Sequence, residues 1–309
     1  MDENTQLIVS TAPHLRDEDS VSMIMYSVVW ALMPATLSAV FFFRGRAVAI
    51  ILTCIITAML AEALAQRVRG VPITLWEGSA LVTGLLLGLN LPPTVPLWMA
   101  ALGTGVAIVV GKQVFGGLGH NPFNPALVGR AFLLAAFPVY MTSWIAPFDA
   151  VSASTPLAQG AGGIYSYGHL YLGLVPGSLG ETSAFALLLG ALYLLYREYI
   201  DWRIPAGYLG TVAVISLLAG QDPLFQLLSG GLMLGALFMA TDMVTTPITR
   251  AGRWLFGIGA GVILMVIRLW GAMPEGVTYS ILLMNGVTPL LNRWTRPRIF
   301  GHGGVKDNG

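Results

Sequence analysis

Charged residues are scarce in this chain. Only 10% of its 309 residues are Asp, Glu, Lys or Arg, whereas 55% are hydrophobic, and the mean hydropathy is +0.73. A soluble globular domain carries roughly 25% charged residues, so these few charges could not cover the surface of a water-soluble protein of this size. The composition therefore predicts a polytopic membrane protein, and it excludes a soluble enzyme, a nucleic-acid-binding protein and a disordered chain.

Cysteine and clustered histidine are also missing. The single cysteine, Cys54, lies in an apolar run, which excludes an intrachain disulfide and a cysteine-ligated metal cluster built from this chain alone. The four histidines are scattered, and no two of them stand at i, i+4 spacing. The Gly-x-Ser-x-Gly elbow of hydrolases and the phosphate-binding Gly-Lys-Ser/Thr loop are absent. The sequence therefore predicts no metal site, no hydrolase and no ATP-driven pump.

Hydrophobic runs fill most of the chain. The first run has 21 residues, enough to cross a bilayer at about 1.5 Å per residue. Several later runs are short and interrupted by Gly or Pro, which is typical of broken helices that line a cavity, although short helices in a thinned bilayer remain an alternative. The runs cover residues 23–43, 47–66, 79–91, 96–110, 125–141, 183–196, 206–219, 224–241, 254–270 and 278–292.

A faint repeat relates the third and eighth runs. Residues 78–90 and 230–242 each place a small amide or acid, Asn90 or Asp242, twelve residues after a Gly, and Thr and Pro follow. Two halves of five spans would be inverted relative to each other, because five is odd. The predicted fold is thus an all-α polytopic membrane protein of about ten transmembrane helices, in two inverted five-helix repeats with broken or short helices, plus one outer loop.

The distribution of Lys and Arg predicts the orientation. With the N-terminus inside, twelve of the sixteen basic residues lie in inner segments, three lie in outer segments, and Arg130 lies within the fifth run. No Lys or Arg occurs from residue 131 to residue 196. The predicted organisation is a cytoplasmic segment 1–22, without the basic flank of a signal peptide, a first repeat 23–141, an outer loop 142–182, a second repeat 183–292 and a cytoplasmic tail 293–309.

Ionisable residues in or beside the runs are functional candidates, because charge is costly to bury in lipid. Asp242 is the strongest, since it lies at the end of a run inside the repeat. Glu62 and Arg130 are balanced between a functional role and an interfacial anchor. Lys112 and Arg268 are expected to be interfacial anchors with their charged groups in water.

Two loop segments carry polar side chains at informative positions. In the Gly-rich segment 116–126, Asn124 precedes Pro125, a pattern typical of a helix N-cap. The alternative is that its amides bind a planar polar ligand. The segment 149–157 is rich in Ser and ends in Pro, and its residue types alone predict local caps or solvated hydroxyls.

The chain resembles a known family nearly from end to end. It is similar to the D subunit of the Rnf complex, an ion-translocating ferredoxin:NAD⁺ oxidoreductase, and more remotely to the B subunit of the sodium-translocating NADH:quinone reductase. The length fits the Rnf protein better. The matching blocks are residues 62–64, 79–87, 116–126, 141–144, 149–157, 240–245 and 295–298.

This resemblance implies a covalently bound FMN. In the family a Thr in a Ser-x-Ala-Thr-like motif carries FMN through a phosphoester, which a flavin transferase installs, and the matching residue here is Thr155. Ser154 stands where the family usually has Ala and offers a second hydroxyl for attachment. Asp149 and Ser152 would belong to the motif that the transferase reads or to the surroundings of the flavin.

The resemblance also implies a second flavin. The related quinone reductase protein holds riboflavin non-covalently against amides at the matching Asn-x-x-Asn-Pro segment, which here contains Asn121 and Asn124. With this resemblance, flavin binding by these amides is as well supported as the N-cap role of Asn124.

The implied function is that of a multi-pass electron-transfer subunit in the cytoplasmic (inner) membrane, with no catalytic residue or metal of its own. Its partners would be the A, B, C, E and G subunits of the Rnf complex, membrane lipid, the flavin transferase and, indirectly, ferredoxin and NAD, but no nucleic acid. Asp242 and Glu62 are the candidates for an ion pathway. The alternatives are the B-type subunit of the quinone reductase and a ten-helix solute channel without a redox role.

Overall fold

The computed structural model describes residues 19–148, 154–159, 165–271 and 276–297, and every element in this part of the chain is helical. The all-α prediction is confirmed. The longer helices are α1 (Val21–Val68), α2 (Ser79–Leu89), α3 (Leu97–Ile108), α4 (Pro125–Ala136), α8 (Ala184–Tyr196), α9 (Arg203–Leu218), α12 (Arg250–Trp270) and α13 (Val277–Trp294). The shorter ones are η1 (Leu75–Glu77), η2 (Val109–Gln113), α5 (Pro138–Met141), α6 (Pro156–Gln159), α7 (Tyr167–Leu172), α10 (Pro223–Leu228), α11 (Leu232–Leu234) and η3 (Gly235–Met239).

The helix α1 is a sharply bent pair of apolar helices. Its backbone leaves the helical region at Arg44, where φ is 52° and ψ is −136°, so the two predicted runs 23–43 and 47–66 lie on either side of the bend. By length and composition, α1 and α12 are apolar enough to cross a membrane. Five further apolar stretches have between 10 and 17 residues, in keeping with the short runs of the sequence.

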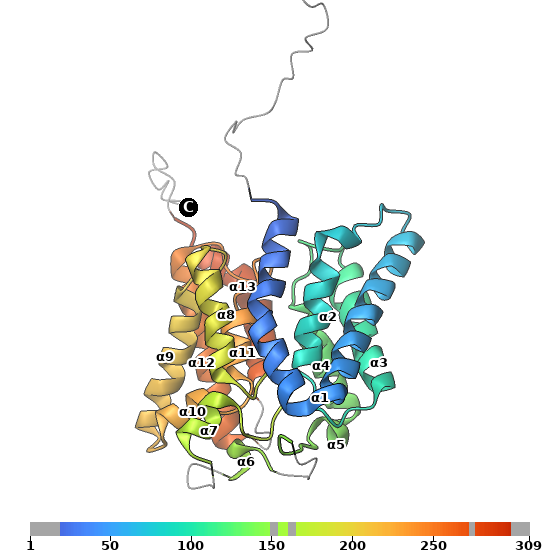
Figure 1. Ribbon diagram of the computed structural model, residues 1–309. Helices are drawn as coiled ribbons and strands as arrows, with labels where there is room; N and C mark the ends of the chain where they lie inside the picture. Colours follow the sequence, from blue (N-terminus) through green and yellow to red (C-terminus); the bar gives the residue numbers. More distant parts are fainter. Residues whose placement is uncertain (1–18, 149–153, 160–164, 272–275, 298–309) are drawn as a thin grey trace, which may run out of the picture.

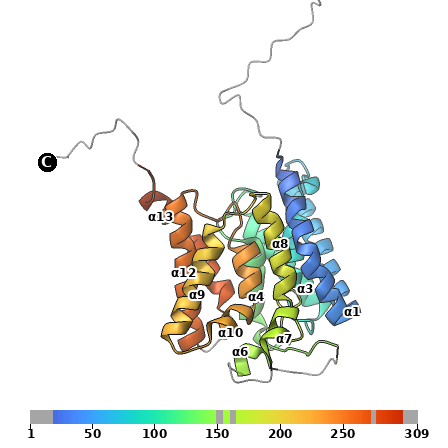
Figure 2. The same ribbon diagram turned by 60° about the vertical axis from the view of Figure 1, so that its left-hand side comes forward.

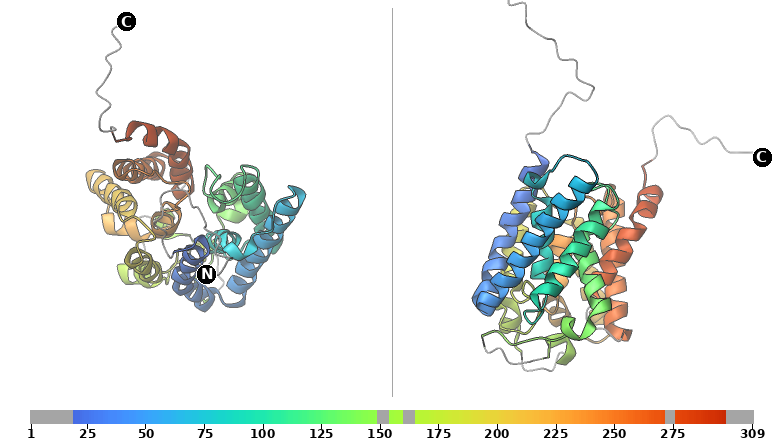
Figure 3. Two further views of the ribbon diagram at one scale, coloured as in Figure 1. Left: turned by 90° about the horizontal axis from the view of Figure 1, so that it is seen from above. Right: turned by 90° about the vertical axis from the view of Figure 1, so that its right-hand side faces the viewer.

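The helices run along one common direction in two groups. The start of α1 and the end of α13 lie at the same end of the molecule, whereas α5, α6 and α7 lie at the opposite end (Figures 1 and 2). Seen along the helices, α1 to α4 form one group and α8 to α13 form the other (Figure 3). A single hydrophobic core joins the groups, with Leu32 of α1, Leu187 of α8 and Phe238 of η3 all buried in it.

A glycine allows the two groups to approach closely. A Cβ atom at Gly190 of α8 would overlap the carbonyl oxygen of Ala31 in α1 and would lie 3.0 Å from the ring of Phe238. Small residues at such contacts let helix backbones pack directly against each other in membrane proteins, where apolar area alone gives little drive to associate.

Two segments are broken inside the bundle, and their ends meet. α2 stops at Leu89, and the predicted run 224–241 is divided into α10, α11 and the π-helical turn η3, with Gly230 at φ 69° between the first two. The amide of Asn90, which follows α2, donates to the sulfur of Met239, the last residue of η3, at 3.1 Å. A second π-helical turn, η2, ends α3 and carries Lys112. Such turns occur often at functional sites.

Candidate functional site

A pocket opens between the two groups of helices, near the end where α1 begins. The cavity has a volume of about 80 Å³, below the roughly 300–1,000 Å³ of small-molecule sites, so it is a narrow cleft that would have to widen around a bound ring. Its polar lining comes from Ser79, Thr83, Lys112, Asn121, Asn124, Tyr199, Thr241 and Asp242.

Asn124 forms the N-cap of α4, as its sequence position predicts. Its side-chain oxygen accepts hydrogen bonds from the backbone N–H groups of Ala126 at 3.0 Å and Leu127 at 3.4 Å. Its side-chain N–H₂ group donates to the carbonyl of Met239 at 3.2 Å, which ties α4 to the end of η3. The cap interpretation is confirmed, and the riboflavin contact of Asn124 stays a prediction.

Asn121 presents an unsatisfied acceptor at the same pocket. Its side chain is only 4% exposed, and its N–H₂ group donates to the carbonyl of Phe123 at 3.1 Å. No donor within the described residues reaches its side-chain oxygen. A buried polar atom without a partner costs about 1–3 kcal/mol, so a ligand that donates a hydrogen bond here would remove this cost.

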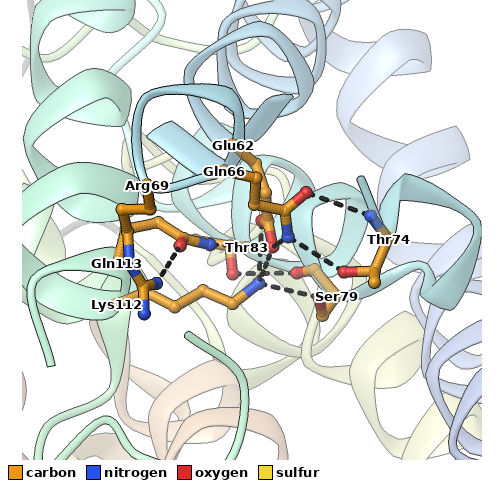
Figure 4. A network of polar contacts seen from close by, with 8 residues as sticks. All are labelled: Glu62, Gln66, Arg69, Thr74, Ser79, Thr83, Lys112 and Gln113. Carbon is orange, nitrogen blue, oxygen red and sulfur yellow. Dashed lines mark hydrogen bonds and ion pairs between the residues drawn. The ribbon is translucent and has the colours of Figure 1, made fainter. Parts of the chain in front are cut away.

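A buried ion pair adjoins the pocket, because Lys112 is part of the pocket lining. Figure 4 shows the contacts of this pair. The Lys112 ammonium donates to both carboxylate oxygens of Glu62, at 2.7 and 2.8 Å, and to the Ser79 hydroxyl at 2.7 Å. Gln113 and Gln66 also donate to Glu62, at 3.1 and 3.4 Å. Glu62 and Lys112 are each 1% exposed. The expectation that Lys112 is an interfacial anchor is therefore wrong, because its charge is neutralised inside the protein.

Asp242 lies at the rim of the pocket and is half-buried. Its carboxylate accepts from the backbone N–H of Val244 at 3.4 Å and from the Thr245 hydroxyl at 3.2 Å. Both bonds are local, within three residues, so they orient the carboxylate without linking it to another helix. The pocket thus brings together Asp242, Asn121, Asn124 and Lys112, and through Lys112 it connects to Glu62.

A second, smaller pocket lies on the other side of the meeting helix ends. There Arg130 donates to Glu181 at 3.1 Å and to the side-chain oxygen of Asn90. Arg268 donates to the carbonyls of Gln226 at 2.7 Å and Ser229 at 3.0 Å. Arg268 is half-buried, and these two backbone carbonyls hold its guanidinium. Its charged group therefore does not lie simply in water, as an interfacial anchor would. Leu157 also lines this pocket.

The predicted flavin-bearing loop is described only in part. Thr155 is 9% exposed and directly precedes α6, whereas Ser154 is exposed. Asp149 and Ser152 lie outside the described residues. Because α6 lies at the end opposite the start of α1 (Figure 1), the structure does not bring Thr155 and Asn121 together.

An ion-pair cluster borders the pocket at the end where α1 begins. Asp201, in the turn before α9, accepts from the backbone N–H of Arg203 at 2.9 Å and from the guanidiniums of Arg203 and Arg253. Burial alone would raise the pKa of the Asp201 carboxyl, but these donors together hold its pKa below its ordinary value. A cleft beside Asp201 shares Tyr199 and Thr241 with the main pocket.

Three residues of these sites were not found by sequence reasoning. The sequence places Glu181 in a polar loop, although it is one of only two acids between residues 131 and 196. Asn285 accepts from the backbone N–H of Asn124 at 3.2 Å, and its polarity within an apolar run was the only signal. Met239 gave no signal, because its role rests on its backbone carbonyl and its place at a broken helix end.

Apolar helices, with polar groups buried where broken segments meet, define a helical membrane protein. The chain belongs to the NQR2, RnfD, RnfE family, whose model matches residues 8–301.

Its relatives are named as components of one kind of complex. The chain is 46% identical to the D subunit of the proton-translocating ferredoxin:NAD(+) oxidoreductase complex of Clostridium ljungdahlii, over 95% of this chain and 96% of the relative. It is 48% identical to the D subunit of the Na(+)-translocating ferredoxin:NAD(+) oxidoreductase complex of Acetobacterium woodii, over 96% and 95%. It is 42% identical to the D subunit of the ion-translocating oxidoreductase complex of Stutzerimonas stutzeri, over 91% and 92%.

The buried ion pair makes a prediction about stability. Glu62→Gln leaves the Lys112 charge buried without its counter-charge, which should lower the free energy of unfolding by about 3–5 kcal/mol. Glu62→Gln combined with Lys112→Met removes both charges and should recover most of the loss. Thermal denaturation in detergent measures both effects. Glu198→Gln, which makes the same change of charge at an exposed acid away from this pair, is the control, and equal stability of Glu62→Gln and Glu198→Gln would contradict the prediction.

Proposed function

We propose that this chain is a membrane electron-transfer subunit of an ion-translocating ferredoxin:NAD⁺ oxidoreductase complex. The observation that carries the proposal is its 46–48% identity, over nearly the whole chain, to the D subunits of two such complexes. The A, B, C, E and G subunits would deliver electrons from ferredoxin and pass them to NAD⁺, or the reverse. A flavin supplies the chemistry, because it exchanges electrons one or two at a time.

We place a covalent FMN on Thr155. The local structure fits a phosphorylated group there. Thr155 is two residues from Leu157, which lines the pocket bordered by the guanidiniums of Arg130 and Arg268. Guanidiniums are the preferred partners of phosphate oxygens, and that of Arg268 would lie near the negative charge of the phosphoester, whereas Arg130 is already paired with Glu181. Ser154 is the second candidate for attachment, and it is the more exposed of the two hydroxyls.

We assign riboflavin to the pocket that contains Asn121, near the end of the molecule where α1 begins. The unsatisfied oxygen of Asn121, at the wall of this pocket, would accept a hydrogen bond from the imide N–H of the flavin ring. Asn124 shapes this wall, because its own amide is already engaged in capping α4 and in bonding Met239. The two proposed flavins would then lie at opposite ends of the molecule.

The proposed topology has ten membrane crossings in two inverted five-helix repeats, with both termini in the cytoplasm and the Thr155 loop outside. The broken segments α2 and α10–η3 occupy corresponding places in the two groups and meet end to end, which supports this arrangement. The cell membrane would be the cytoplasmic (inner) one. A flavin transferase outside the cytoplasm would then meet the loop on its own side.

The ion pathway is proposed to pass the meeting ends of the broken helices, with Asp242 as its entry. The carboxylate of Glu62 is already held by the Lys112 ammonium, so Asp242, at the rim of the pocket, is the more available of the two acids. The relatives do not agree on the coupling ion, since one is named proton-translocating and another Na(+)-translocating.

The attachment site is tested by peptide mass spectrometry of the complex from a host that contains the transferase. FMN is expected on Thr155, and the flavin fluorescence of the denatured protein should vanish in Thr155→Val and persist in Ser154→Ala. FMN on Ser154 would correct the site. A wild-type protein without covalent flavin would contradict the redox role and favour a solute channel.

The riboflavin assignment predicts a loss of non-covalent flavin in Asn121→Leu. The lost hydrogen bond should weaken binding by roughly tenfold, and Asn121→Asp, which keeps an acceptor oxygen, should lose less. Flavin released by acid measures the effect, and retained covalent FMN shows that each variant has folded. Equal release from wild type and Asn121→Leu would refute the assignment.

The role of Asp242 predicts weaker ion transport. In vesicles containing the complex, Asp242→Asn should slow redox-driven ion uptake by about tenfold or more, while covalent FMN stays unchanged. Asp222→Asn, which neutralises a partly exposed acid at the N-cap of α10 and keeps a capping side chain, serves as the control. Normal uptake in Asp242→Asn would exclude Asp242 from the pathway.

A further inference from the structure

A groove lies at the bend of α1, at the end of the molecule that carries α5 and α6 (Figure 1). About 440 Å³ of it accepts the centre of a water-sized sphere, far more than in the pocket that contains Asn121. Its lining is formed by Phe42, Phe43, Arg44, Arg46, Pro93, Thr94, Ile145, Ala146 and Phe148.

Two exposed guanidiniums give the groove a positive rim. Arg46 is fixed in place, because it donates to the carbonyls of Pro93 at 2.8 Å and Thr94 at 3.0 Å. These bonds use two of the five N–H donors of a guanidinium, so the others remain available to an anion. Arg44 is exposed beside it. Among the described residues that line the groove, none is acidic, and Asp149 lies outside the described residues.

Two residues that line the groove have an unusual backbone conformation. Arg44 and Phe148 both have positive φ, 52° and 70°, which is uncommon for residues with a side chain. The N–H of Phe148 donates to the carbonyl of Phe42 at 3.3 Å, which links the two strained segments. Positive-φ residues of this kind persist where the surroundings over-determine them, often at binding sites.

An apolar track leads away from the groove along α1. The rings of Phe41, Phe42 and Phe148 pack edge to face, with centroids 5.4–5.5 Å apart. Phe41 is 67% exposed, and Leu37 and Trp30 are exposed to a similar degree. Their spacings of four and seven residues place them on one face of α1. The apolar face therefore continues directly from the cationic groove into the membrane-spanning part of the helix.

We propose that this groove binds an anionic phospholipid. Its phosphate would lie between Arg44 and Arg46, and an acyl chain would lie along Phe41, Leu37 and Trp30. The combination of fixed guanidiniums at a helix bend and an exposed apolar face matches a molecule with a negative head group and a hydrocarbon tail. A free phosphate would use the rim but not the apolar track.

The test counts lipids on this chain. The complex is placed in nanodiscs of equal phosphatidylcholine and phosphatidylglycerol, and native mass spectrometry records the lipid that stays on this chain after release. We expect one phosphatidylglycerol on the wild type, with at least a tenfold loss in Arg44→Gln/Arg46→Gln. Arg67→Gln and Arg293→Gln, combined in one variant, remove the same charge at the other end of the molecule and should retain it. Phe41→Ser should weaken retention without any change in charge.

Each other outcome overturns the proposal. Equal retention of the two lipids by the wild type, or equal loss in both double variants, would show that no specific site exists at the bend. Displacement by millimolar inorganic phosphate would identify a free-anion site in place of a lipid site.

Discussion

The broken helix ends at the centre of the bundle must be satisfied by the protein itself, because lipid offers no hydrogen bonds to free backbone groups. Asn124 meets part of this need by donating to the carbonyl of Met239, and Asn90 approaches the sulfur of the same residue. Asn285 adds a further link, since it accepts from the N–H of Asn124 and donates to the carbonyl of Thr245. This amide layer joins the two groups of helices and separates the pockets on its two sides.

Buried charges must likewise find their partners within the protein. Lys112 and Glu62 neutralise each other in the first group of helices, and Arg130 and Glu181 do so in the pocket that Leu157 also lines. A buried pair of this kind contributes little net stability, but the loss of one partner is costly. Each pair therefore constrains the packing of the segments that carry it, because moving them apart would leave a buried charge without its partner.

The two pockets lie toward opposite ends of the molecule, which bears on the proposed function. The one that contains Asn121 lies near the end where α1 begins, and the one that contains Leu157 lies toward the end that carries α6. A protein that hands electrons between partners on opposite sides of a membrane needs cofactor sites near both of its ends. The proposed function assigns one flavin near each of these ends.

The sequence by itself determined the membrane class, the approximate helix ranges and the cap at Asn124, because these depend on composition and local hydrogen bonding. It could not determine that Lys112 is buried, since its partner Glu62 lies 50 positions away along the chain. The Gly-interrupted runs predicted broken helices, but the sequence could not reveal that the run 224–241 breaks at Gly230, or that Asn285 contacts Asn124 across 161 positions. Only the tertiary structure decides which distant polar groups meet, because those contacts depend on how the helices pack.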